Sequence, residues 1–131
     1  MKLSQGFISN HITQWINAWN SKDTDVILSL YSDNIEFSSP KIKKIFSDYK
    51  TNTIKDKNNL KKYFSIGLKK FPNLIFEPMD FVTKDNIIIL EYIAYPNDQV
   101  KWNVLEKFEF DESGKVMKSS VYIGMEDENT N

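Results

Sequence analysis

The chain has 131 residues, of which 40% are hydrophobic and 14% aromatic, so one globular domain can bury its core without disulfide or metal staples. It contains no cysteine, which excludes disulfides, thiolate nucleophiles and cysteine metal sites. The net charge of −1 gives no electrostatic reason to expect nucleic acid as a partner. All 17 basic residues are lysine, so no guanidinium fork is present for bidentate recognition of phosphate or carboxylate.

Membrane insertion and metal binding are disfavoured by the same sequence. No apolar run approaches the ~18 residues of a membrane helix, and the longest is Ile87–Leu90. The amino terminus lacks an extended apolar segment followed by a small-residue cleavage site, so we expect no secretion and a cytoplasmic location. With His11 as the one histidine and only scattered carboxylates, we expect no metal and no other cofactor.

Two helices and a strand are predicted for the first third of the chain. Apolar residues recur at helical spacing between about residues 4 and 20 and define one buried face: Ile8, Ile12, Trp15, Ile16 and Trp19. Asp23 is placed to cap a second, short helix, because its carboxylate accepts bonds from unpaired backbone N–H groups. The buried stripe expected for that helix is Val26, Ile27, Leu30 and Tyr31. A strand follows at 35–38, and Pro40 helps to end it.

The middle of the chain combines a charged segment with a clear helix. Residues 41–57 carry six lysines without a clean period, which predicts a solvated loop with Ile45 and Phe46 turned inward. Next, an i, i+3, i+4 stripe of apolar residues predicts a third helix over 60–71, and Pro72 ends it.

Four strands are predicted for the last part of the chain. Their segments are LIFEPMDFV, NIIILEYIAY, VKWNVLEKFEF and KVMKSSVYIGM, and the turns between them favour consecutive antiparallel pairing. Residues 126–131 are polar, and we expect a frayed tail. Helices at one end of the chain and strands at the other indicate a single α+β domain over 1–131, with helices on one concave sheet face.

Particular residues in this order add a family resemblance over about residues 5 to 125. They are Trp15, Trp19, Asn20, Asp23, Asp25, Leu30, Tyr31, Asp33, Phe37 and Pro40, then NLKKYF at 59–64 and KFEFDESGKV at 107–116. The chain thus resembles the nuclear transport factor 2-like superfamily, and within it the SnoaL-like and ketosteroid-isomerase-like group. The resemblance implies a cone-shaped, curved antiparallel sheet wrapped around a long N-terminal helix. With three helices in all, counting the N-terminal one, this is a cystatin-like α+β barrel with an apolar cavity at its open end.

The catalytic positions of the ketosteroid isomerases are only partly retained. The resemblance places Ser39 where these enzymes have a proton-shuttling aspartate, and a serine hydroxyl has no useful basicity near neutral pH. Trp15 falls at the oxyanion tyrosine, and an indole donates a hydrogen bond but does not titrate. Glu106 falls at a second oxyanion donor, an aspartic acid, and burial in an apolar cavity would raise the pKa of its carboxyl. Glu106 is therefore the catalytic candidate.

The acid/base pair of the SnoaL-like cyclases has no convincing counterpart. Those enzymes resemble this chain but place an aspartate late on the last strand, near a histidine. Ser119 and Ser120 occupy that region here. We expect His11 to be a partly exposed helix residue, because no second catalytic group is tied to it.

The leading functional prediction is an apolar, aromatic-lined cavity that binds a small molecule. The expected lining residues are Trp15, Trp19, Tyr31, Phe37, Ser39, Tyr63, Phe76, Tyr92, Trp102 and Ile123, with Glu106 among them. The ligand would be mostly apolar, with one carbonyl or hydroxyl group that meets Glu106, and the reaction an isomerisation, cyclisation or dehydration. The alternative for Trp15 and Trp19 is plain core packing, and for Glu106 a structural carboxyl satisfied by a neighbouring donor.

A second prediction comes from another class of function, a non-catalytic homodimerisation or protein-interaction domain. In NIIILEYIAY both alternating sets of side chains are largely apolar: Ile87, Ile89, Ile93 and Tyr95 on one side, and Ile88, Leu90, Tyr92 and Ala94 on the other. A strand that is apolar on both sides is covered on both sides. One side faces the interior, so we expect the outer sheet face to form a homodimer interface.

Overall fold

The computed structural model describes residues 2–124, so the predicted tail at 126–131 lies outside the described residues. The helices are α1 (Gln5–Ser21), α2 (Thr24–Leu28), α3 (Ile42–Ile45) and α4 (Lys57–Lys70). The strands are β1 (Tyr31–Ser38), β2 (Thr53–Ile54), β3 (Ile75–Lys84), β4 (Ile87–Tyr95), β5 (Trp102–Phe110) and β6 (Val116–Ile123). No helix in this part of the chain is both long and apolar enough to cross a membrane.

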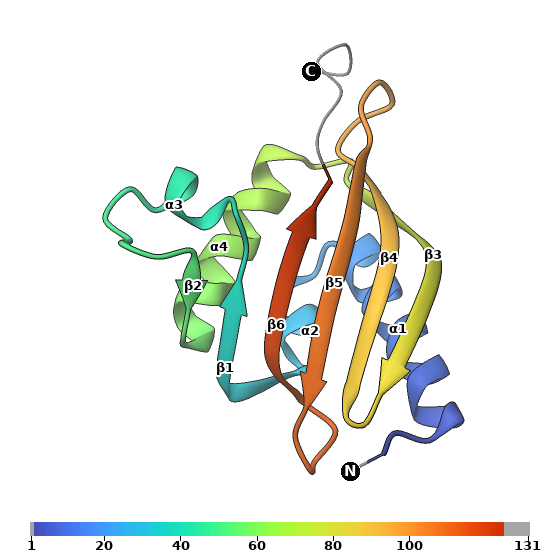
Figure 1. Cartoon of the computed structure of the whole chain (residues 1–131). Coiled ribbons are helices and arrows are strands. Elements are labelled where there is room, and N and C mark those ends of the chain that lie inside the picture. Colours follow the sequence, from blue (N-terminus) through green and yellow to red (C-terminus); the bar gives the residue numbers. More distant parts are fainter. Residues whose placement is uncertain (1, 125–131) are drawn as a thin grey trace.

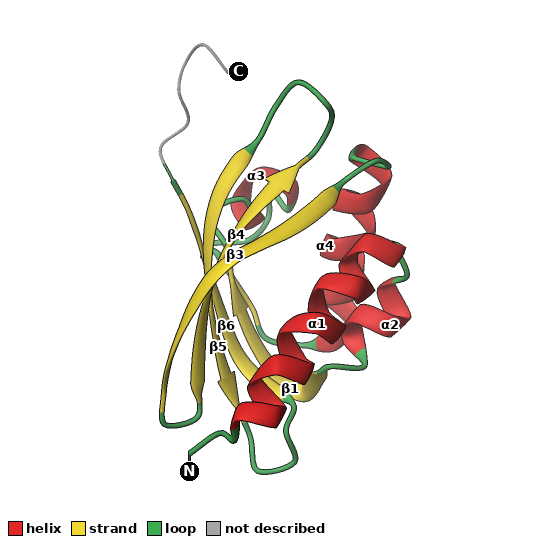
Figure 2. Cartoon of the chain, turned by 90° about the vertical axis from the view of Figure 1, so that its right-hand side faces the viewer, coloured by secondary structure: helices red, strands yellow, loops and turns green. Residues whose placement is uncertain are grey.

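All the strands described join one sheet, in the order β2-β1-β6-β5-β4-β3 (Figure 1). The last four strands form the antiparallel meander that the sequence predicts. The first strand is added to the meander in parallel, beside β6. The sheet is curved and does not close on itself, α1 and α4 lie on its concave side, and α2 packs against these two helices (Figure 2). The predicted α+β fold, with helices on one face of a curved sheet, is confirmed.

The segment 41–57 is more ordered than the predicted loop. It contains the one-turn helix α3 and the short strand β2, so the described residues form four helices rather than three. Ile42 and Ile54 are completely buried and anchor this segment, whereas Ile45 and Phe46 are only half-buried. Two isolated apolar residues among lysines have no period, and this explains why the sequence pattern predicts neither element.

The boundary between α2 and β1 also differs from the prediction. Asp23 caps α2 as expected, since its carboxylate accepts from the backbone N–H groups of Asp25 and Val26. The helix ends at Leu28, however, and Tyr31 begins a strand, while Val26 is 47% exposed. The backbone N–H of Val116 in β6 donates to the carbonyl of Leu30 at 2.9 Å. Pairing with the sheet therefore replaces the last predicted turn of helix.

The narrow end of the cone is filled by aromatic rings around His11. This side chain is only 4% exposed, which corrects the prediction of partial exposure. Its ring centroid lies 4.6 Å from that of Phe110 and 5.1 Å from that of Phe108, and it stacks on Phe7 one helical turn earlier. Burial lowers the pKa of His11 to about 4, so the imidazole is neutral at neutral pH. His11 is buried in spite of its polarity because it lies on the apolar face of α1.

Candidate functional site

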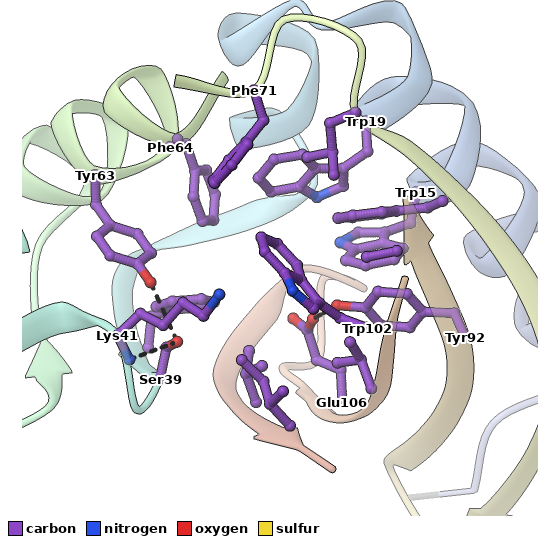
Figure 3. Close-up of a pocket in the computed structure, with 18 of the residues that line it drawn as sticks. Trp15, Trp19, Ser39, Lys41, Tyr63, Phe64, Phe71, Tyr92, Trp102 and Glu106 are labelled. Carbon is purple, nitrogen blue, oxygen red and sulfur yellow. Dashed lines mark hydrogen bonds between the residues drawn. The ribbon is translucent and has the colours of Figure 1, made fainter. Parts of the chain in front are cut away.

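A cavity of about 140 Å³ lies at the wide end of the cone, and Figure 3 shows the side chains that line it. At this end β1 and β6 end and β5 begins. Glu106 and every predicted pocket residue except Tyr31 line it: Trp15, Trp19, Phe37, Ser39, Tyr63, Phe76, Tyr92, Trp102 and Ile123. The residues come from α1, α4 and five of the strands or their ends, so the complete fold is needed to build the cavity.

Tyr31 does not line the cavity but supports it. Its hydroxyl accepts a hydrogen bond of 3.0 Å from the indole Nε1 of Trp15, and the side chain is 1% exposed. The prediction that Tyr31 lines the pocket is therefore wrong: it belongs to the core and fixes the orientation of a residue that does line the cavity. A tyrosine on the inward face of a strand can lie in the cavity wall or in the core behind it. Here the hydrogen bond from the Trp15 indole holds Tyr31 in the core.

The aromatic wall of the cavity is a continuous set of ring contacts. Trp15 stacks on Phe76 with centroids 5.4 Å apart and meets Tyr92 edge-on at 5.2 Å. The ring centroid of Trp19 lies 5.1 Å from that of Phe76 and 4.7 Å from that of Phe64. Such pairs add about 0.5–1.5 kcal/mol each beyond their burial and restrict ring motion. The two tryptophans are therefore core residues and cavity walls at once.

Glu106 is the polar centre of the apolar wall. Its side chain is 2% exposed, and its neighbours Val104 and Phe108 on the same face of β5 are also buried. The Tyr92 hydroxyl donates to Oε1 at 2.8 Å, and the Ser119 hydroxyl donates to Oε2 at 2.7 Å. These two donors come from the strands on either side of β5, so the sheet itself holds the carboxyl group in place.

Burial and hydrogen bonding act on Glu106 in opposite directions. Burial raises the pKa of the carboxyl to about 7, while the bonds from Ser119 and Tyr92 favour the charged form and limit the rise. Near neutral pH both protonation states are therefore populated, which is the condition for a group that takes up and returns a proton. Each carboxyl oxygen retains a lone pair after accepting one bond. Glu106 is thus structurally satisfied and still has acceptor capacity for a ligand in the cavity.

A second polar cluster lies across the cavity from Glu106 (Figure 3). The Tyr63 hydroxyl donates to Ser39 Oγ at 3.1 Å, and the backbone N–H of Lys41 donates to the same oxygen at 3.4 Å. The Lys41 ammonium nitrogen lies 3.5 Å from the centroid of the Trp102 ring. Burial raises the pKa of Tyr63, which therefore stays neutral and serves as a donor.

Sequence reasoning missed several members of this site. Ser119 was noted only as a serine where cyclases have an acid, but its diagonal position relative to Glu106 across β5 and β6 makes it a donor. Phe64 and Phe71 line the cavity and belong to the same apolar stripe as Tyr63. The period of this stripe could therefore have predicted both as lining residues. Lys41 had no signal, because a lysine in a charged segment is typical of a solvated surface.

A metal centre is not formed by the residues described. Within 2–124, no group of three or more histidine, cysteine, aspartate or glutamate side chains is placed to hold a metal ion.

A curved sheet wrapped around a long helix, with an aromatic cavity at the wide end, defines a member of the nuclear transport factor 2-like superfamily. Within the superfamily, the SnoaL-like domain family matches residues 12–118. The chain belongs to this family. No match was found among curated proteins.

Solved structures share the fold over most of the chain. A SnoaL-like protein of unknown function from Burkholderia thailandensis is 27% identical, with a TM-score of 0.86 over 95% of this chain and 100% of that one. AclR, a putative hydroxylase from Streptomyces galilaeus, is 22% identical, with a TM-score of 0.72 over 93% and 78%. SalBIII, an epoxide hydrolase/cyclase-like enzyme in pyran ring formation in the polyether salinomycin, is 17% identical, with a TM-score of 0.70 over 89% and 90%.

Proposed function

We propose that the protein binds a compact, mostly apolar small molecule in the aromatic cavity, and that Glu106 acts on it as a general acid and base. The observation that supports this most directly is the position of Glu106. It is a fully buried carboxyl with two fixed hydroxyl donors, and it lines a cavity whose other walls are mainly aromatic. A site of this kind suits a ligand with one carbonyl or hydroxyl group on an apolar body.

The proposed chemistry is proton transfer next to a carbonyl group, as in an isomerisation, cyclisation or dehydration. The Glu106 carboxylate removes a proton from the carbon beside the carbonyl. The electron pair of that C–H bond forms a carbon–carbon double bond, and the carbonyl π pair moves onto the oxygen, which gives an enolate. The carboxylic acid then returns the proton to carbon. Tyr92 and Ser119 hold the carboxyl in one orientation, and each compensates part of its charge when it is ionised. Two proteins of similar fold, named as a putative hydroxylase and an epoxide hydrolase/cyclase-like enzyme, agree with a small-molecule role.

Proton exchange into a simple ketone tests this proposal. 2-Tetralone, a bicyclic ketone, is incubated in D₂O with the protein, and loss of its C1 proton signal is followed by NMR. We expect the wild-type protein to accelerate the exchange and Glu106→Gln to lose that acceleration by at least about 100-fold, because a carboxamide is not basic. His11→Phe is the matched control at another buried titratable residue, one that does not line the cavity, and it should keep the activity. Equal rates for the wild type and Glu106→Gln would refute the role of Glu106.

Homodimerisation is a second candidate function, favoured by the uncovered outer face of the sheet (Figure 2). Val82, Leu105 and Tyr122 on this face are 62%, 46% and 58% exposed, and Leu105 and Tyr122 are directly paired across β5 and β6. The outer set on β4 is only half-buried, whereas Ile88, Leu90, Tyr92 and Ala94 on its inner side are buried. Exposed apolar side chains grouped in this way are typical of an interface.

The dimer proposal predicts a measurable change of mass in solution. Light scattering behind gel filtration at micromolar concentration should give twice the chain mass for the wild type. Leu105→Asp should give a monomer, because it places a charge in the proposed interface. Glu109→Gln, near the far end of β5, removes one charge from the same strand and serves as the control that should remain dimeric. A monomeric wild type would contradict the proposal.

The expected cytoplasmic location stays a prediction, to be checked by fractionation.

A further inference from the structure

The cavity extends from a buried floor to a half-buried rim. Glu106 and Trp15 at the floor are 2% and 1% exposed, whereas Gly67, Phe71 and Trp102 at the rim are half-buried. The rings of Phe71 and Trp102 meet edge-on, with centroids 5.2 Å apart. Figure 3 shows Phe71 on the opposite side of the cavity from Glu106. A ligand whose polar group reaches Glu106 therefore extends toward the end of α4 with the rest of its body.

Gly67 lies on α4 where the apolar stripe of the helix faces the cavity. It follows Phe64 by one helical turn and precedes Phe71 by another, and all three residues line the cavity. Residues at this spacing share one face of a helix. Glycine in the interior of a helix is less favourable than alanine, because it loses more conformational freedom on folding. Gly67 therefore lowers the stability of α4 at a position that faces the cavity.

Neither the backbone nor the packing of α4 requires a glycine at position 67. Among the described glycines, only Gly114 has a positive φ, the conformation that favours glycine. Apart from its chain neighbours and the backbone of its own helix, a Cβ atom on Gly67 would meet no described atom within 4 Å. A Cβ atom on Gly124, in contrast, would lie 3.4 Å from the carbonyl oxygen of Asn103. The missing side chain of Gly67 thus leaves open space, and this space adjoins the cavity.

We propose that Gly67 determines the specificity of the cavity: its missing side chain leaves a subsite for the apolar end of a ligand whose carbonyl or hydroxyl group meets Glu106. This inference rests on the proposed binding function and narrows the ligand class to molecules with a polar group at one end and an apolar substituent at the other. The rings of Phe64, Phe71 and Trp102 would border the substituent and remove it from water. A side chain at position 67 would occupy the same space and restrict the cavity to shorter ligands.

NMR titration of the ¹⁵N-labelled protein tests the subsite, because all three tryptophans of the chain line the cavity and their indole N–H signals report binding. The probes are benzamide and 4-tert-butylbenzamide, which share the carbonyl end and differ in the apolar substituent. We expect the wild type to bind 4-tert-butylbenzamide roughly tenfold more tightly, because its substituent is removed from water. Gly67→Leu should reduce this preference to about onefold, since the leucine side chain fills the space. Gly67→Ala should give an intermediate preference and yet raise the urea midpoint of unfolding.

The matched control is Gly6→Leu in the first turn of α1. A Cβ atom on Gly6 also meets nothing described within 4 Å, but Gly6 is exposed and is not among the described residues that line the cavity, so this variant should retain the full preference. In the wild type, the tert-butyl protons of the bound probe should show an NOE to the α protons of Gly67. This measurement needs no variant, so it remains decisive if circular dichroism shows that Gly67→Leu does not fold.

The outcomes separate the subsite from the cavity. A bound probe without the NOE to Gly67, or a folded Gly67→Leu that keeps the wild-type preference, would overturn the subsite. Equal affinity of the wild type for the two probes would also overturn it and leave the cavity proposal standing. Failure of the wild type to bind either probe would overturn both proposals.

Discussion

Among the described residues, each end of the cone buries one histidine or carboxyl side chain, His11 at the narrow end and Glu106 at the wide end. Burial acts on both in the same sense, against the charged form, and moves the pKa of His11 down to about 4 and that of Glu106 up to about 7. The surroundings differ: Nε2 of His11 has no hydrogen-bond partner among the described residues and is enclosed by rings, whereas Glu106 has two donors and lines a cavity. A perturbed pKa thus marks a candidate site only where a ligand has access.

The largest expected effect concerns Glu106 at the wide end: it should make the free energy of unfolding of the protein depend on pH. The folded pKa of Glu106, about 7, lies above the ordinary value of 4.5, so the contribution of Glu106 to stability is greatest below pH 4.5 and falls as the pH rises to 7. The loss is about 3 kcal/mol at most. Glu106→Gln cannot ionise and should remove this slope, so at pH 8 it should be more stable than the wild type. Urea unfolding between pH 4 and 8 measures this, and parallel curves for the two proteins would contradict it.

His11 should show the opposite dependence. Its folded pKa of about 4 lies below the ordinary 6.5, so the contribution of His11 to stability is complete above pH 6.5 and falls as the pH drops toward 4. His11→Phe should flatten this acid side by up to about 3 kcal/mol at the lowest pH. At pH 7 it should also add about 1 kcal/mol, because a buried nitrogen without a partner is removed. The same urea series checks both effects, and an unchanged acid limb would show that His11 is not buried as a neutral group.

A smaller effect is expected from the hydrogen bond behind the aromatic wall. Tyr31→Phe deletes the acceptor of the Trp15 indole N–H and leaves that buried donor unpaired. The free energy of unfolding should fall by about 1–2 kcal/mol. Tyr122→Phe, an exposed tyrosine of β6, is the control and should change stability by less than about 0.5 kcal/mol. Equal stability of Tyr31→Phe and the wild type would mean that the bond does not support the wall.

The fold followed from the sequence where local pattern and tertiary structure agree. The period of α1 and α4 and the alternation of β3 to β6 each need only one buried face, which a single sequence displays. The structure of segment 41–57 was not predicted, because its buried anchors Ile42 and Ile54 belong to two separate short elements and share no sequence period. Tyr31 was wrongly placed on a helix because a short apolar run suits a helix or a strand, and pairing with β6 decides between them.

The aromatic part of the site was predictable for a different reason from the polar part. Trp15, Trp19 and Phe76 are large apolar residues on inward faces, and the element order alone brings them together. Ser119 and Lys41 required the strand register and the direction of a turn, which no local pattern of serine or lysine contains. Glu106 was singled out because the resemblance to the ketosteroid isomerases places their second oxyanion donor at this position. Its place on an apolar strand face agrees with that choice, because conflicts of this kind gather at functional sites.

The central claim is that Glu106 is a titrating group in a cavity that accepts ligands, and NMR of the ¹³C-labelled glutamate carboxyls tests it most directly. Assigned through Glu106→Gln, one resonance should titrate near pH 7, and its pKa should change when 4-tert-butylbenzamide is added, while the pKa of His11 stays unchanged. A Glu106 resonance that titrates near 4.5 with and without the amide would contradict the account.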